Sequence, residues 1–170
     1  MPTVKKSVDV DVPVRIAYDQ WTQFEEFPRF MEGVEAVQQL DDKRLHWRAK
    51  VGGKVEEWDA EINEQVPDKI ISWRSTSGAR NEGIVRFVPI NENKTKIELE
   101  MHWEPKDVTE RVGDVLGMDD ARIQGDLGRF KKFIEERRSP TGAWRGKISG
   151  DKVEGDHAEE DLEARTSSRG

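Results

Sequence analysis

The order of the expected elements constrains the fold of this chain more than any other feature. An alternating strand at 4–12 is followed by a short helix, then by strands joined by tight turns, and finally by a long amphipathic helix. Short connections favour antiparallel pairing between sequential strands. We therefore expect an α+β fold, in which a curved seven-stranded antiparallel sheet wraps around one long C-terminal helix, with short helices after the first strand.

Hydrophobic periodicity places the individual elements. Val14–Trp21 has apolar residues at helical spacing, and Phe24–Met31 forms at most one further helical turn because Pro28 interrupts it. The glycines at 52–53 indicate a two-residue hairpin. After the first strand, alternating patterns predict strands at Val34–Leu40, Arg44–Val51, Lys54–Glu64, Ile70–Ser75, Glu82–Pro89 and Lys94–Trp103.

The long helix is expected to start near Asp107 and to end at Ser139-Pro140. Its apolar face recurs at helical spacing through Val112, Leu116, Ile123, Leu127, Phe130 and Ile134. Gly117, followed by two aspartates, predicts a kink or a second helix start. A stripe of small residues follows the helix at Gly113, Gly117, Ala121, Gly125 and Gly128. It indicates either a solvated face or the close approach of another backbone.

Alternation within the strands separates an aromatic face from a charged face. Ion pairs across strands are expected on the outer face, among His46, Arg48, Glu57, Asp59, Arg74, Arg86 and His102. The inner face is either ordinary core or the wall of an apolar cavity, with indole N–H groups as polar handles. The candidate lining residues are Phe27, Phe30, Met31, Trp47, Trp58, Trp73, Phe87, Met101, Trp103, Leu116 and Met118.

The helix kink adds a hypothesis about access to that cavity. A break in a helix is a plausible hinge, so Leu116 and Met118 beside Gly117 are expected to form a gate.

Composition excludes several classes of function. The net charge of −7 and the lack of a basic patch argue against nucleic-acid binding. The chain has no cysteine and only three scattered histidines, so we expect no metal site and no cofactor. No nucleotide-binding or nucleophile motif occurs, and no catalytic set is evident. The absence of a signal-peptide pattern and of a membrane-spanning run predicts a cytoplasmic protein.

The last part of the chain differs from the rest. Residues 139–170 are charged and rich in Ser and Gly, and no aromatic residue follows Trp144. Such a segment buries too little apolar surface to offset the entropy of ordering, so we expect a domain at 1–138 and a disordered tail at 139–170. The segment around Trp144 is expected to dock that side chain on the domain.

Residues 1–138 resemble the START-like, helix-grip superfamily, and more narrowly its polyketide cyclase/dehydrase group, which includes coenzyme Q-binding proteins. The matching segments are Ser7-Val8-Asp9-Val10, Val14–Trp21, Phe24–Val34, Trp58–Ile62, Pro67–Ser75, Gly83–Phe87, Trp103-Glu104-Pro105 and Leu127–Glu135. The resemblance implies a helix-grip fold with an apolar pocket between sheet and helix. Its implied ligands are lipids, quinones or polyketides.

Three functions remain open on the sequence. The first is binding or transport of a hydrophobic small molecule, and the second is a polyketide cyclase/dehydrase-type enzyme. An enzyme of that kind needs polar groups inside the pocket, and the inward positions offer only Ser75, the indole N–H groups and Tyr18. The third is a protein-interaction module without a ligand. The oligomeric state is not specified by any of these patterns.

Overall fold

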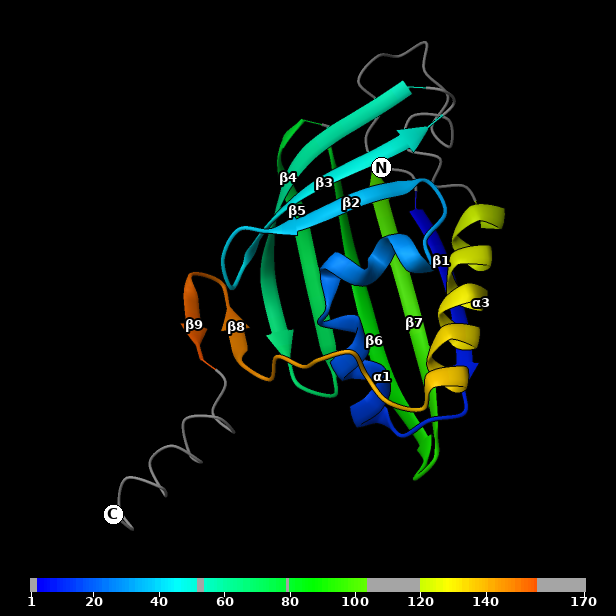
Figure 1. The fold of residues 1–170 in the computed structure, drawn as a ribbon. Helices are drawn as coiled ribbons and strands as arrows, with labels where there is room; N and C mark the ends of the chain where they lie inside the picture. Colours follow the sequence, from blue (N-terminus) through cyan, green and yellow to red (C-terminus); the bar gives the residue numbers. More distant parts are fainter. Residues whose placement is uncertain (1–2, 52–53, 79, 104–119, 156–170) are drawn as a thin grey trace.

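The computed structural model describes residues 3–51, 54–78, 80–103 and 120–155. Three helical segments lie between strands in the order of the described elements (Figure 1). The elements are β1 (Thr3–Val10), α1 (Val14–Trp21), the 3₁₀ helix η1 (Phe24–Arg29), β2 (Val34–Gln39), β3 (Arg44–Val51), β4 (Lys54–Val66), β5 (Ile70–Gly78), β6 (Asn81–Asn91), β7 (Lys94–Trp103), α3 (Asp120–Arg137), β8 (Lys147–Ser149) and β9 (Lys152–Glu154).

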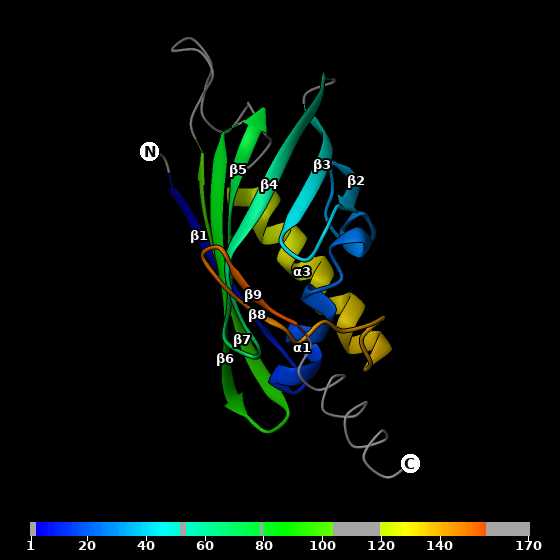
Figure 2. The ribbon, with the colours of Figure 1, turned by 90° about the vertical axis from the view of Figure 1, so that its left-hand side faces the viewer.

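The main sheet confirms the expected antiparallel arrangement. The described sheet has nine strands, two more than the expected seven. Seven of them lie in the order β1-β7-β6-β5-β4-β3-β2, so only the first departs from sequential order, while β8 pairs with β4 and β9 with β8. Figure 2 shows that the sheet curves and that α1, η1 and α3 all lie on its inner side. The β4–β5 pairing contains two irregularities, which increase local twist and bend the sheet. The expected α+β helix-grip fold is therefore confirmed.

The core lies where α1, η1, α3 and the sheet meet. Trp21 of α1 is almost fully buried and packs its ring near-perpendicular to three others: Phe27 of η1, Phe87 of β6 and Phe130 of α3. Edge-to-face pairs of this kind contribute about 0.5–1.5 kcal/mol each beyond the area they bury. This side chain thus joins both helical layers to the sheet.

The long helix presents the expected apolar face to the sheet over its described part. Ile123, Leu127, Phe130 and Ile134 are all buried. The kink expected at Gly117 lies outside the described residues, as do Gly113, Leu116 and Met118. Within α3, a Cβ added at Gly128 would meet nothing within 4 Å, which agrees with a solvated small-residue face. None of the described helices is long and apolar enough to cross a bilayer.

The C-terminal part of the chain differs from the expected disordered tail. Residues 139–155, here called the C-terminal strap, run from the end of α3 across α1 and add β8 to the side of β4 (Figure 1). Ile148 is fully buried opposite Gln65, and Trp144 packs against the core as expected. A few specific contacts, rather than average hydrophobicity, order the strap. Residues 156–170 lie outside the described residues.

Polar contacts fix the strap to α1. Gln20 and Thr141 exchange two hydrogen bonds, of 3.0 Å and 2.8 Å. The backbone N–H of Trp144 donates to Thr22 Oγ1 at 3.1 Å. Arg145 pairs with Asp19 and, at 2.8 Å, with Asp68. Burial raises the pKa of Asp19, and the hydrogen bond from Arg145 opposes that rise. The ordered domain therefore extends to residue 155.

The Asp19–Arg145 pair gives a test of the strap. Arg145→Met removes the cation and leaves Asp19 buried, so the free energy of unfolding is expected to fall by about 3 kcal/mol. Urea unfolding measures this loss. Lys147→Met changes an exposed lysine of the same strap and is expected to have little effect. Equal stability of the two variants would show that the strap is not part of the cooperative fold.

The outer face of the sheet carries the expected cross-strand ion pairs. His46 of β3 contacts Asp59 at 2.6 Å and Glu57 at 3.2 Å, both on β4. The hydrogen bond to Asp59, followed by the one to Glu57, raises the pKa of His46 above its ordinary 6.5. These groups are substantially exposed, so each pair contributes little to stability.

The His46 contacts predict a pH dependence with a defined sign. Because the folded-state pKa is raised, the stabilisation is complete below pH 6.5 and is lost as pH rises through the folded value. Asp59→Asn should return the pKa of His46 toward 6.5 in an NMR titration. Asp9→Asn, at the opposite edge of the sheet on β1, serves as the control. An unchanged His46 titration in Asp59→Asn would contradict this assignment.

Candidate ligand-binding site

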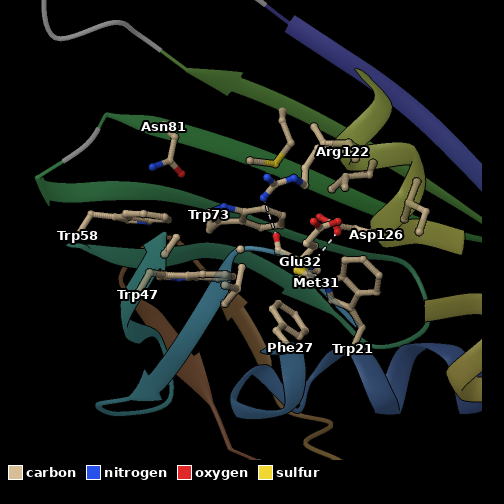
Figure 3. Close-up of a pocket in the computed structure, with 17 residues that line it drawn as sticks. Trp21, Phe27, Met31, Glu32, Trp47, Trp58, Trp73, Asn81, Arg122 and Asp126 are labelled. Carbon is tan, nitrogen blue, oxygen red and sulfur yellow. Dashed lines mark hydrogen bonds between the residues drawn. The ribbon is translucent and has the colours of Figure 1, made fainter. Parts of the chain in front are cut away.

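A cavity of about 90 Å³ lies between the sheet and α3 (Figure 3). Its walls come from the end of α1, from η1 and the turn after it, from strands β2 to β7, and from the first turns of the described α3. The lining residues are Trp21, Phe27, Met31, Glu32, Gly33, Val34, Trp47, Ala49, Trp58, Trp73, Asn81, Leu99, Met101, Arg122, Ile123, Asp126 and Leu127. Most of these side chains are apolar, so the interior favours an apolar occupant.

Two stacked tryptophans form one wall. Trp47 and Trp58 face each other across the β3–β4 pairing, and their rings are nearly parallel, with 5.9 Å between centroids and 6° between planes. Phe27 of η1 packs against Trp47, with 5.6 Å between ring centroids. Flat aromatic surfaces of this kind suit a planar or a flexible apolar ligand equally well.

A missing side chain makes room for the next wall. Gly83 of β6 is paired with Trp73 on one side and Met101 on the other. A Cβ at this position would lie 2.4 Å from Trp73 Cζ2 and 2.8 Å from the Met101 sulfur. The glycine therefore lets both side chains lie flat over the strand, where they line the cavity.

The charged lining residues gather at the rim between α3 and the turn after η1 (Figure 3). Arg122 Nη1 donates to the Glu32 carbonyl at 2.8 Å, and Asp126 Oδ1 accepts from the Glu32 N–H at 3.0 Å. Arg129 pairs with Asp126 and donates to the Phe30 carbonyl at 2.9 Å. Burial raises the pKa of Asp126, while the hydrogen bonds from Arg129 and Glu32 oppose the rise.

Two polar groups lie away from this rim. Asn81 is buried beside Trp58, and its backbone N–H donates to Ser75 Oγ at 2.9 Å. The indole N–H of Trp47 is buried and has no hydrogen-bond partner among the described residues. A buried unpaired donor is costly, so it is a natural partner for an acceptor atom on a ligand.

The structure brings together part of the set of residues expected to line the cavity. Six of them do line it: Phe27, Met31, Trp47, Trp58, Trp73 and Met101. Phe30 instead packs against Phe130 and Phe133, and Phe87 packs against Tyr18 and Trp21. The side chain of Trp103 lies outside the described residues, as do Leu116 and Met118.

Several lining residues were not among those expected. Trp21 was assigned only to the helix, yet its spacing from Ala17 and Tyr18 marks it as inward-facing. Arg122 and Asp126 immediately precede apolar positions of α3, and that adjacency is the one sequence signal that could have indicated them. Tyr18, expected as a polar pocket residue, instead accepts a hydrogen bond from Gln65 at 3.0 Å outside the cavity lining. Burial raises its pKa.

Comparison with known proteins identifies the family. Residues 10–132 match the family described as polyketide cyclase / dehydrase and lipid transport. The chain belongs to this family. A protein of Streptomyces lincolnensis, described as an uncharacterized 17.2 kDa protein in the melC2-rnhH intergenic region, is 49% identical over 149 residues. The match covers 87% of this chain and 99% of that protein.

Solved structures share the fold at low sequence identity. The Zhui aromatase/cyclase from Streptomyces sp. R1128 is 15% identical, with a TM-score of 0.67 over 84% of this chain and 98% of that one. A START superfamily protein from Mycobacterium smegmatis is 16% identical, with a TM-score of 0.61 over 79% of this chain and 95% of that one. These likenesses place the chain in the START-like fold.

The space provided by Gly83 gives a test of the cavity wall. In Gly83→Ala the new methyl group forces Trp73 and Met101 to move, so the free energy of unfolding should fall by about 1–3 kcal/mol. Near-ultraviolet circular dichroism should also change as Trp73 is displaced. Gly128→Ala is the matched control: it meets open space on a helix and should stabilise by about 0.5–1 kcal/mol. Changes of the same sign in both variants would contradict the described packing.

Proposed function

We propose that this protein binds a hydrophobic small molecule in the cavity between the sheet and α3. The observation that carries the proposal is an aromatic and aliphatic cavity whose charged lining residues lie at one rim. Burial of apolar ligand surface in such a site is worth roughly 25 cal/mol per Å². The family description, which includes lipid transport, supports the same conclusion.

The chemistry of the walls defines the class of ligand. A lipid tail, a quinone or a polyketide-like ring system fits surfaces built from indole, phenyl and thioether groups. The unpaired Trp47 N–H supplies one donor for a ligand oxygen. The volume of about 90 Å³ is small, but a further void of about 10 Å³ shares Trp21, Phe27, Trp47 and Trp73 as walls. Joining the two voids would require these shared rings to move.

A cyclase/dehydrase activity is the second candidate, and one observation favours it. Asp126 lines the cavity, and burial raises its pKa, so its carboxyl group is a candidate for proton exchange with a ligand. Arg122 beside it on the helix could orient a carbonyl oxygen.

An interaction module without a ligand is less well supported, because the interior contains a cavity. We propose a cytoplasmic location, with which a chain lacking cysteine is compatible.

Native mass spectrometry of the protein purified from cells tests the binding proposal. We expect an additional mass that is released by denaturation and extracted into organic solvent. Ala49→Leu adds bulk to a buried lining position and excludes part of the ligand. Each ligand CH₂ group that it displaces costs about 0.8 kcal/mol of binding, so occupancy should fall about tenfold or more. Ala36→Leu, at an exposed position of β2, should retain the ligand.

The same experiment separates the two candidate functions. A carrier returns the extracted compound unchanged after incubation, whereas a cyclase/dehydrase returns a cyclised product or one that has lost water. Equal occupancy in Ala49→Leu and Ala36→Leu would place the ligand elsewhere. An empty protein whose tryptophan emission is also unaffected by the neutral fluorophore N-phenyl-1-naphthylamine would overturn the proposal.

A further inference from the structure

Three side chains on one face of α3 hold the backbone of a single turn. Arg122, Asp126 and Arg129 lie four and then three residues apart, so they project from the same side of the helix. Arg122 donates to the Glu32 carbonyl at 2.8 Å, and Asp126 accepts from the Glu32 backbone N–H at 3.0 Å (Figure 3). The backbone N–H and the C=O of Glu32 are therefore both bound. Together the three side chains are called the rim latch.

The rest of the latch strengthens the same junction. Arg129 donates to the Phe30 carbonyl at 2.9 Å, pairs with Asp126, and lies 3.7 Å from the Glu32 carboxylate. Hydrogen bonds that involve charged groups are about twice as strong as neutral ones. The latch is therefore a concentrated polar contact between the helix and the turn.

Gly33 is adapted to this contact. Its φ of +88° suits glycine, and a Cβ there would lie 2.2 Å from Arg122 Nη1. The guanidinium thus lies directly over the glycine backbone. A side chain at position 33 would displace it from the Glu32 carbonyl.

The turn itself is fixed at both ends. Phe30 packs between Phe130 and Phe133, and the Lys50 N–H donates to the Gly33 carbonyl at 2.7 Å. Opening the junction therefore requires the side chains of α3 to move, because the turn is tied to the core and to the sheet.

The latch closes one side of the cavity. Glu32, Gly33, Arg122 and Asp126 all line it, and the cavity volume is about 90 Å³. Sites for drug-sized ligands usually measure about 300–1,000 Å³, so a ligand of that size requires the walls of this cavity to move apart. Access at this rim requires the Arg122 and Asp126 hydrogen bonds to Glu32 to break.

We propose that the rim latch is the gate through which the apolar ligand exchanges, with Arg122 and Asp126 controlling its rate of opening. The proposal rests on the binding function above. Weakening the latch should accelerate association and dissociation together, because both require the same rim to open. A role confined to stability would lower the melting temperature without that paired change in rates.

Stopped-flow fluorescence with N-phenyl-1-naphthylamine tests the gate, because the cavity tryptophans transfer energy to this probe. In Arg122→Met and in Asp126→Ala, both rate constants should rise about tenfold or more, since each variant loses at least one hydrogen bond to a charged group. Arg122→Lys keeps a charged donor and should give intermediate rates. Lys132→Met, at an exposed position of the same helix, should match the wild type. Thermal unfolding shows that each variant is folded.

The outcomes separate the gate from the binding site. Probe binding with unchanged rates in Arg122→Met and Asp126→Ala would overturn the gate and leave the binding function standing. Faster association and dissociation in both variants, with Lys132→Met matching the wild type, would support the gate. Failure of every protein, wild type included, to bind the probe would overturn the binding function and the gate with it.

Discussion

The position of Trp21 is the constraint on which the rest of the structure depends. Its ring contacts Phe27, Phe87 and Phe130 at centroid distances of 5.6, 6.1 and 5.0 Å, so α1, η1, the sheet and α3 meet at one buried side chain. The same ring lines the cavity. The aromatic core and the candidate binding site are thus one continuous structure, and movement in one is transmitted to the other through close packing.

Polar contacts secure the two ends of this aromatic centre. At one end, the C-terminal strap places Arg145 between Asp19 and Asp68 and covers α1. At the other, the rim latch joins α3 to the backbone of Glu32. Both are charged groups with several hydrogen-bond partners, which is the arrangement that makes buried charge tolerable. The strap closes the domain, whereas the latch borders the cavity and is therefore suited to exchange.

Most of the fold was predictable because periodicity is a local property. Alternation in Arg44–Val51 and Lys94–Trp103 and helical spacing in Val14–Trp21 were sufficient to give the element bounds that the structure shows. The site was predictable only in part. Phe30 and Phe87 share the pattern of the cavity residues but pack into the core, because a pattern shows that a side chain faces inward and not what it meets there.

The sequence by itself determined the element types, the inner and outer faces of the strands and the aromatic character of the interior, because these depend on neighbouring residues. Only the tertiary structure decided that the C-terminal strap is ordered, that Gly83 leaves room for Trp73, and that Arg122 and Asp126 form hydrogen bonds with the backbone of Glu32. Those features join residues as many as 126 positions apart, as in the Asp19–Arg145 pair. Contacts at such separations follow from the closure of the whole chain, and no local pattern specifies them.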